Sequence, residues 1–289
     1  MPKVKLTIIE SNCRSGHHKK DDSYIVEDIC APICHELWNS IYPSIYVLLS
    51  GGTLDYGNSK ATKFQAKCPD GGRVVIRGEL LMKDVFEKAF DGFKFTSDLH
   101  KDTYNLLIIH NRQVVAEHSK AVAEECRSLA IKFGINEEAA EIAGLLHDIS
   151  AVFPFNKRLE VSNLLGIQVL KEEEEFPLIL HQKISQVMAK DIWNISNEVI
   201  LSAIGCHTTL KKEYSKLDLI LFVADKVKWD QEGTPPYLEE VIRGLDISLE
   251  YGAYAYIKHL MENKSKLKVV HPWLIDAYNS LRAKLNDIS

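Results

Sequence analysis

The segment Ile-Ala-Gly-Leu-Leu-His-Asp at residues 142–148 decides the fold class of the larger part of this chain. Its apolar residues predict a buried helix from Ala139 to Ile149, and His147 and Asp148 lie near the end of that helix. Burying an imidazole and a carboxylate without partners would cost several kcal/mol for each group. We therefore expect other helices to supply partners for this pair.

Four further polar residues occur in a similar context. His118 lies on the apolar stripe of a helix predicted from Val114 to Gly134. His181 follows Pro-Leu-Ile-Leu, His207 follows Ala-Ile-Gly-Cys, and Asp225 follows Leu-Phe-Val-Ala. Each side chain is thus placed where its helix turns toward the interior.

A shared pair of divalent cations would satisfy all of these groups. Imidazole and carboxylate together suit Mn, Fe, Co, Ni or Zn. With Asp148 bridging, two metals can be held by His118, His147, Asp148, His181, His207 and Asp225. Such a pair binds hydroxide at neutral pH and neutralises charge that develops on phosphoryl oxygens. The set predicts a metal-dependent phosphohydrolase with Asp148 and His147 as catalytic residues.

Each residue alone has an ordinary alternative explanation. A single histidine in an apolar context is more often a hydrogen-bonded core residue. Asp225 could cap a helix or pair with Lys226 or Lys228. The complete order of His, His-Asp, two spaced histidines and Asp within one helical domain favours the metal site.

Residues 104–289 are predicted to form an all-α domain, because strand signals are nearly absent there. Besides the two helices named above, we expect helices over 161–170, 180–193, 197–206, 215–229, 237–262 and 272–285. The acidic run Glu172–Glu175 is predicted to be a solvated helix end and loop.

Residues 1–82 are predicted to form a small α+β domain, and residues 83–103 a junction. Val4, Leu6 and Ile8 alternate with polar residues, as in a strand with one buried face. Further strands are expected over 23–27, 63–67 and 73–81, with a helix over 34–49 that Pro43 should kink or divide.

The six cysteines include four in the first quarter of the chain and no Cys-x-x-Cys pair. Cys13, His17, Cys34 and Cys68 could form a soft metal or redox site, but their spacing matches no standard zinc pattern. Ordinary buried thiols are the favoured interpretation. This region resembles a small uncharacterised bacterial domain with spaced cysteines, for which no activity is implied.

Net charge, polarity and cysteine usage argue against a nucleic-acid-binding, membrane-spanning or secreted protein. The chain has 289 residues, a net charge of −5 and a pI of about 6.1, so no global basic field attracts nucleic acid. The uncharged stretch between Glu36 and Asp55 is too polar for a membrane helix. Reduced thiols and the lack of a signal peptide pattern indicate a cytoplasmic protein. The sequence leaves open whether the protein forms a homodimer.

Several short motifs carry a family resemblance. They are Glu117-His118-Ser119, Gly144-Leu145-Leu146-His147-Asp148, Leu180-His181-Gln182-Lys183, Cys206-His207-Thr208-Thr209, Phe222-Val223-Ala224-Asp225-Lys226 and His271-Pro272-Trp273. Residues from about 105 to 285 resemble the YqeK-like branch of the HD-domain phosphohydrolases.

The resemblance implies an all-helical fold and a dinuclear, often iron-containing, site. It implies that one metal is held by His118, His147, Asp148 and Asp225, and the second by His181 and His207 with Asp148 shared. The implied activity is symmetrical hydrolysis of the small nucleotide diadenosine tetraphosphate to two ADP. His271 matches the family and is interpreted as a structural element at a helix start.

The chain departs from the family pattern at three places. Leu210-Lys211-Lys212-Glu213 replaces the usual Gly-Arg-Pro-Gly, Ile149-Ser150-Ala151 replaces Tyr-Ala-Lys, and Ser185 replaces a glycine. Candidate phosphate contacts are Lys183, Thr208, Lys211 and Lys228, although surface lysines are commonly only solvated. Two alternatives stay open: an HD nucleotidase or phosphodiesterase acting on another nucleotide, and a nucleotide-sensing module with little turnover.

Overall fold

The structure is a computed structural model that describes residues 3–27, 29–50, 52–57, 60–81, 86, 89–229 and 233–286. The chain divides into two compact units, Met1–Asp91 with Glu160–Val169, and Gly92–Leu159 with Leu170–Ser289. The boundary expected at residues 82 and 83 lies outside the described residues. In the part of the chain that the structure describes, no helix combines the length and apolarity needed to cross a bilayer.

The first unit contains a four-stranded antiparallel sheet in the order β2-β1-β6-β5. Its strands are β1 (Lys3–Ser11), β2 (Ser23–Val26), β5 (Lys63–Lys67) and β6 (Val74–Leu81). The alternation in β1 places the side chains of Val4, Leu6 and Ile8 in the core with no exposed surface. A short ribbon of β3 (Leu54–Asp55) and β4 (Lys60–Ala61), which the sequence did not indicate, completes the strands described.

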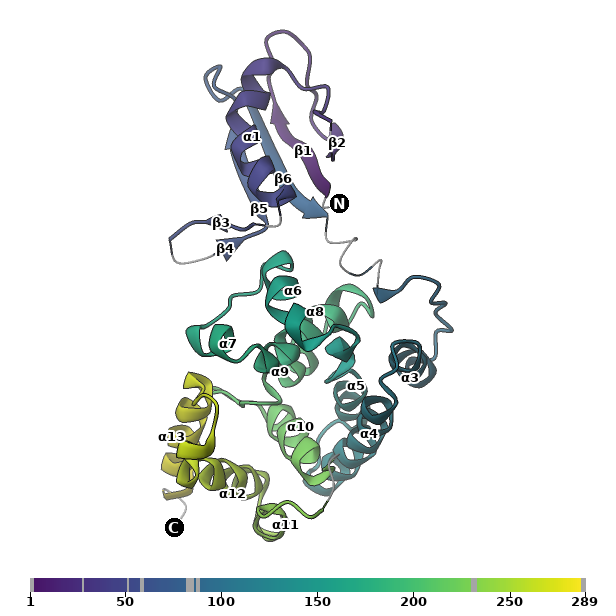
Figure 1. Cartoon of the computed structure of the whole chain (residues 1–289), viewed down its shortest axis with the longest axis vertical. Helices are drawn as coiled ribbons and strands as arrows, with labels where there is room; N and C mark the ends of the chain where they lie inside the picture. Colours follow the sequence, from purple (N-terminus) through teal and green to yellow (C-terminus); the bar gives the residue numbers. More distant parts are fainter. Residues whose placement is uncertain are drawn as a thin grey trace. The chain divides into compact units, whose positions relative to one another are not determined.

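One helix, α1 (His35–Leu49), packs on this sheet and contributes four fully buried side chains, Leu37, Ile41, Ile45 and Leu48 (Figure 1). The expectation that Pro43 would divide this helix is wrong, because the helix continues through it. Proline removes one backbone hydrogen bond, to the carbonyl four residues earlier. Here Pro43 and Asn39 both lie on the exposed face, where water can satisfy that carbonyl.

The second unit is helical, and no strand occurs among its described residues, which confirms the predicted fold class (Figure 1). Its α-helices, with α6 at the division between the units, are α3 (Leu99–Ile109), α4 (Gln113–Phe133), α5 (Glu137–Leu146), α6 (Arg158–Leu164), α7 (Lys171–Glu175), α8 (His181–Asp191), α9 (Glu198–Cys206), α10 (Lys216–Val227), α11 (Leu238–Leu245), α12 (Leu249–Glu262) and α13 (Pro272–Asn286). Short 3-10 turns include η1 (Ile149–Val152), η2 (Phe155–Lys157) and η3 (Pro177–Leu180).

Local signals explain where the central helices begin and end. Gly134 adopts a left-handed φ of 68° directly after α4. The Asn136 side chain accepts a hydrogen bond from the Ala139 amide at 2.8 Å and caps α5. Ser215 and Asp218 form a capping box at the start of α10. These signals fix one end of each of three helices, and His118, His147 and Asp225 lie at or near the opposite ends.

Two helix predictions, over 237–262 and 161–170, are wrong in extent. The helix expected over 237–262 is two helices, α11 and α12, because Ser248 is extended and its hydroxyl caps α12 at the Tyr251 amide. The two helices pack closely at Gly244, where an added Cβ would lie 2.7 Å from the Tyr251 carbonyl oxygen. The helix expected over 161–170 ends at Leu164, followed by Gly166 with a φ of 66°.

The acidic run at 172–175 is a further correction, because it is not solvated throughout. Glu173 on α7 has no exposed surface. Its carboxylate accepts hydrogen bonds from the Leu170 amide at 2.8 Å and from Lys183 Nζ at 2.7 Å, and lies 3.3 Å from His271 Nε2. The partners come from α8 and from the start of α13, so the run of charges alone could not reveal them.

Candidate metal centre

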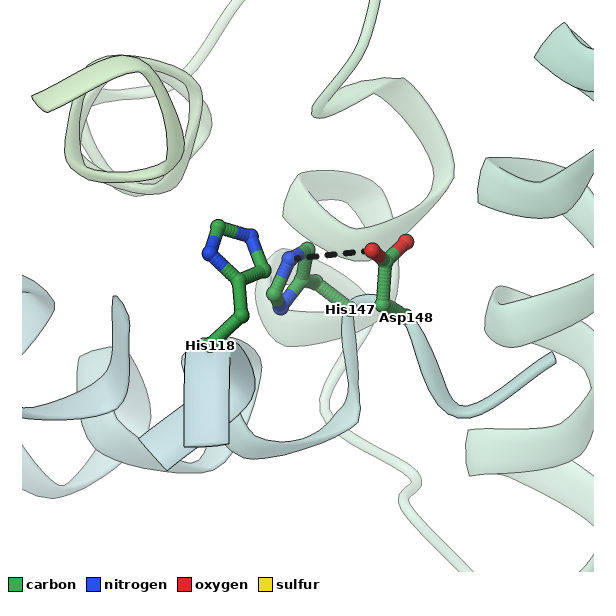
Figure 2. Close-up of side chains that lie close together, drawn as sticks. All are labelled: His118, His147 and Asp148. Carbon is green, nitrogen blue, oxygen red and sulfur yellow. Dashed lines mark ion pairs between the residues drawn. The ribbon is translucent and has the colours of Figure 1, made fainter. Parts of the chain in front are cut away.

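The structure brings all six predicted ligands together. His147 and Asp148 follow the end of α5, His181 begins α8 and His207 follows α9. Among the described residues, ligand atoms lie within 4.8 Å of one another in two groups: His118, His147 and Asp148, and Asp148, His181 and His207. Figure 2 shows the first group, with the three side chains directed toward one another. Asp225 on α10 joins it through an Oδ1 atom 3.0 Å from His118 Nε2.

Asp148 links the two groups with its two oxygen atoms. Its Oδ2 lies 3.6 Å from His147 Nε2, the contact drawn in Figure 2. Its Oδ1 lies 3.3 Å from His181 Nε2 and 3.6 Å from His207 Nε2. The carboxylate is therefore placed between the two groups, as a bridging ligand requires.

Three of the histidines are oriented by the same local device. Each Nδ1 atom lies within hydrogen-bond distance of the carbonyl three residues earlier: His147 to Gly144 at 2.8 Å, His181 to Leu178 at 2.6 Å, and His207 to Ile204 at 2.8 Å. A carbonyl can only accept, so each Nδ1 carries the proton and donates. Each neutral ring then presents a lone pair at Nε2, which is the arrangement typical of metal-ligating histidines.

The Nε2 atoms of these histidines carry lone pairs and lie close together, with no proton between them to form a hydrogen bond. The Nε2 atoms of His181 and His207 lie 2.9 Å apart. The Nε2 atom of His147 is buried and has no hydrogen-bond partner. Buried polar atoms without partners are unfavourable, and a divalent cation held by nitrogen and carboxylate donors would satisfy them. The residues present thus fit the metal pair that the sequence predicts.

Burial and neighbouring charges set the protonation states. Burial lowers the pKa of His147 to about 4 and that of His181 to about 3, although the Asp148 carboxylate opposes both shifts. Burial alone would raise the pKa of Asp148, but the imidazoles of His147 and His181 outweigh it and hold that pKa well below its usual range. At neutral pH the neutral imidazoles of His147 and His181 therefore face the ionised carboxylate of Asp148, as metal binding requires.

Asp225 has partners on both of its oxygen atoms. Oδ1 faces His118, and Oδ2 accepts a hydrogen bond from the buried ammonium of Lys226. Burial would raise the pKa of Asp225, but the Lys226 charge and the His118 contact hold it well below its usual range. The predicted Lys226 pairing therefore coexists with a ligand position and orients the carboxylate.

The four predicted phosphate contacts each have a partner within the fold. Lys183 forms the buried ion pair with Glu173, and Lys228 lies 3.0 Å from Glu125. Lys211 donates to Ser202 Oγ at 2.6 Å and lies 3.7 Å from an oxygen of Asp218. Thr208 is at the centre itself, with its hydroxyl 3.0 Å from His181 Nε2. Three of the four candidates thus carry a charge that the fold already balances.

The three departures from the family pattern have structural consequences here. Ser185 Oγ accepts a hydrogen bond from the Ser150 amide at 3.1 Å, and Ser150 Oγ donates to the His181 carbonyl at 2.9 Å. Two departures are therefore in contact and together hold the first turn of α8. Leu210 stands where the family has glycine and adopts a left-handed φ of 55° while fully buried.

Two further residues at the centre, Gln182 and Arg158, were not predicted as site residues. Gln182 accepts from the Thr208 amide at 3.0 Å and donates to Thr209 Oγ1 at 3.2 Å, which fixes the loop after His207. Arg158 Nη1 donates at 3.1 Å to the Leu178 carbonyl, the same oxygen that orients His181. The motif Leu-His-Gln-Lys contains Gln182, whereas Arg158 lies outside every motif.

In the first unit, a cavity of about 370 Å³ is lined in part by Cys13, His17, Cys34 and Cys68. The thiols are free. Among the described residues, three metal-ligating atoms come within 4.8 Å of one another only in the two groups of the helical unit. These residues share a cavity without forming such a group.

Comparison with known proteins places this geometry in a family. A family model described as HD domain matches residues 115–230. An uncharacterised protein from the pepC 5′ region of Lactococcus lactis subsp. cremoris is 45% identical over 152 residues, 53% of this chain and 77% of that protein. The symmetrical bis(5′-nucleosyl)-tetraphosphatase of Staphylococcus aureus is 29% identical over 113 residues, 38% of this chain and 57% of that protein, which is less than two thirds of its length.

The fold is also found in a solved structure. A predicted HD superfamily hydrolase involved in NAD metabolism, from Clostridium acetobutylicum, matches with a TM-score of 0.58 and 24% identity, over 66% of this chain and 98% of that one. Together with the matched family model, these similarities confirm the resemblance seen in the motifs. Residues 115–230 of this chain are an HD domain.

Proposed function

We propose that this protein hydrolyses phosphoanhydride bonds in nucleotides, and that its reaction is the symmetrical cleavage of diadenosine tetraphosphate to two ADP. The observation that carries the proposal is the convergence of unprotonated imidazole nitrogens on the two oxygens of Asp148. A relative from Staphylococcus aureus that is named for this activity supports the choice of substrate.

The six ligand residues would hold two divalent transition metals, of which iron is the proposed pair and Mn, Co, Ni or Zn would also suit the donors. Such a pair supplies a nucleophile at neutral pH and neutralises charge on phosphoryl oxygens. Asp148 would span both positions, and Lys226 would hold Asp225 in its orientation. Asp148 and His147 are proposed as the catalytic residues because they are adjacent in sequence and Asp148 belongs to both ligand groups.

The chain's own groups also bear on the substrate. The Thr208 hydroxyl lies beside His181 and is a hydrogen-bond donor for a phosphoryl oxygen. In a bridge of four phosphates, attack on the second phosphorus expels an intact nucleoside diphosphate and leaves another. The proposed cut therefore needs one diphosphate half on the metals and the other outside them.

Product analysis in oxygen-18 water tests this proposal. Diadenosine tetraphosphate should give only ADP, with label in one ADP per turnover. AMP with ATP would show an asymmetric cut and contradict the proposal. Nucleotide binding without turnover in the fully metal-loaded protein would instead favour a sensing module.

One observation favours a second candidate, a nucleotidase or phosphodiesterase acting on another nucleotide. Leu210 and Lys211 replace the family's Gly-Arg, and Lys211 is engaged with Ser202 and Asp218. A lysine cannot reproduce the bidentate contact of the missing arginine. Turnover on a mononucleotide or cyclic nucleotide, with none on diadenosine tetraphosphate, would decide for this candidate.

A further inference from the structure

Two arginines contact backbone carbonyls near the candidate metal centre. Arg112 Nε donates a hydrogen bond to the Ala151 carbonyl at 2.8 Å. Arg158 Nη1 donates to the Leu178 carbonyl at 3.1 Å, and His181 Nδ1 donates to that same oxygen at 2.6 Å. One backbone oxygen therefore separates the Arg158 guanidinium from a ligand of the metal centre.

The charges of these two arginines are not balanced by direct ion pairs. Neither forms an ion pair with a carboxylate among the described residues. The Nε atom of Arg158 is buried and has no hydrogen-bond partner. Since Nη1 is used by a carbonyl, the edge formed by Nε and Nη2 is the one that can bind an anion through two parallel hydrogen bonds.

The electrostatic surroundings agree with this geometry. Burial lowers the pKa of Arg158, the Asp148 carboxylate opposes that shift, and the neighbouring charge of Arg112 adds to it. Two like charges on half-buried side chains raise the free energy of the empty site, and a bound anion would relieve their repulsion. The Leu178 carbonyl that Arg158 contacts also orients His181, so the anion position is linked to the centre through that oxygen.

The two arginines come from different parts of the chain. Arg112 holds the carbonyl of Ala151 from the start of α4, and Arg158 begins α6, ten residues beyond Asp148. The lysines at 183, 211 and 228 are engaged with carboxylates elsewhere in the fold.

We propose that Arg158, with Arg112 beside it, forms an anion site that binds a phosphate group of the substrate next to Asp148, His181 and His207. This inference rests on the proposed function for the identity of the substrate, but phosphate binding itself can be measured without turnover. The planar fork of arginine suits a phosphate better than the point charge of a lysine.

The test is calorimetric titration of inorganic phosphate into the full chain loaded with Mn²⁺. Arg158→Gln should weaken phosphate binding about tenfold or more, the effect of losing a charge-assisted bidentate contact. Arg158→Lys should recover part of the loss, and Arg112→Gln should show a smaller one. The matched control is Arg127→Gln, because Arg127 pairs with Glu137 and Glu141 on the surface of the helical unit.

The metal content of each variant is measured in parallel and should stay at the wild-type value, which separates anion binding from damage to the metal centre. Unchanged phosphate affinity in folded, metal-loaded Arg158→Gln would overturn the proposal, as would failure of the wild type to bind phosphate. If Arg158→Gln does not fold, equal affinity of Arg158→Lys and wild type would overturn it.

Turnover of diadenosine tetraphosphate separates this inference from the proposed function. If Arg158→Gln loses phosphate affinity while the wild type cleaves no tetraphosphate, the anion site stands and the substrate assignment fails. If the wild type is active and phosphate affinity is unchanged in the variant, the assignment stands and the anion site fails. If both the anion site and the substrate assignment are correct, Arg158→Gln should raise the KM for diadenosine tetraphosphate by a larger factor than it lowers kcat.

Discussion

His181 and His207 face one another with their Nε2 atoms 2.9 Å apart, although neither nitrogen carries a proton in the tautomer that their Nδ1 contacts require. An ordinary hydrogen bond cannot join two lone pairs. A cation bound by both nitrogens would account for this contact, and the Oδ1 atom of Asp148 lies close to both of them. The predictions below begin from this arrangement.

Removing the shared carboxylate should empty the centre. The wild-type chain is expected to hold about two transition-metal ions, as dinuclear hydrolases do. Asp148→Ala should retain well under half of that metal, because Asp148 belongs to both ligand groups. Elemental analysis after desalting measures this, with Asp246→Ala as a control at an exposed ion pair with Lys132. Equal metal content in the wild type and Asp148→Ala would contradict the assignment of Asp148 as a shared metal ligand.

The metal-free protein should lose stability as the pH falls from about 6.5 to about 4. Burial lowers the pKa of His147 to about 4 and of His181 to about 3, so the unfolded chain binds protons in this range that the folded chain does not. The free energy of unfolding should fall by about 2 kcal/mol for each histidine, or roughly 4 kcal/mol in all, between pH 7 and pH 5. Urea unfolding after chelation measures it. A His181→Gln variant should show a weaker dependence on pH, and an equally steep one would contradict the stated cause.

Among the glutamates at 172–175, Glu173 should be the one whose substitution lowers the stability of the protein most. Glu173→Gln leaves Lys183 without its buried counter-charge, and removal of one partner of a buried pair costs about 3–5 kcal/mol. The retained amide can still bond to its neighbours, so we expect a loss of about 2–4 kcal/mol. Denaturant unfolding measures this against Glu174→Gln, whose side chain is exposed and should change stability by less than about 0.5 kcal/mol. Similar values for the two variants would show that the buried network adds little.

The helical unit is proposed to fold without the first unit, and its start can be chosen from the capping contacts. The Asp98 side chain accepts a hydrogen bond from the Lys101 amide, and Asp102 accepts two from Thr96. A fragment of residues 92–289 should therefore unfold at a higher temperature than one of residues 101–289, which lacks both caps. Loss of a helix cap costs about 1 kcal/mol. Equal melting temperatures, or an insoluble longer fragment, would contradict this proposal.

The features that the sequence predicted share a physical basis. The proposed ligands lie next to or among apolar residues, which must be buried in the core. The neighbouring residues therefore predict that side chains such as His147 and His207 point inward. The strand of Val4, Leu6 and Ile8 was predictable for the same reason. The division of the 237–262 helix was missed because a serine cap and a close contact at Gly244 outweigh a continuous helical pattern.

The features that were missed depend on distant partners. Burial of Glu173 depends on Lys183 and His271, which are far from it in sequence or on another helix. The placement of Arg158 depends on a carbonyl at Leu178. The conformation of Leu210 was also not predictable from its neighbours. Its left-handed backbone costs about 1–2 kcal/mol, and the burial of its side chain contributes roughly 2–5 kcal/mol, which is more. No pattern of neighbouring residues encodes such balances.

The contact between Glu173 and His271 also has a consequence for the order in which contacts form during translation. Glu173 and its partner Lys183 are translated well before residue 271, and His271 supplies the last group near this carboxylate. A nascent chain that has passed Asp225 already contains all six proposed ligands, yet Glu173 still lacks one of its partners. On the proposed assignment, metal binding can therefore precede the contact with His271, and the segment that carries His181 and Lys183 gains its full set of contacts only after residue 271 has left the ribosome.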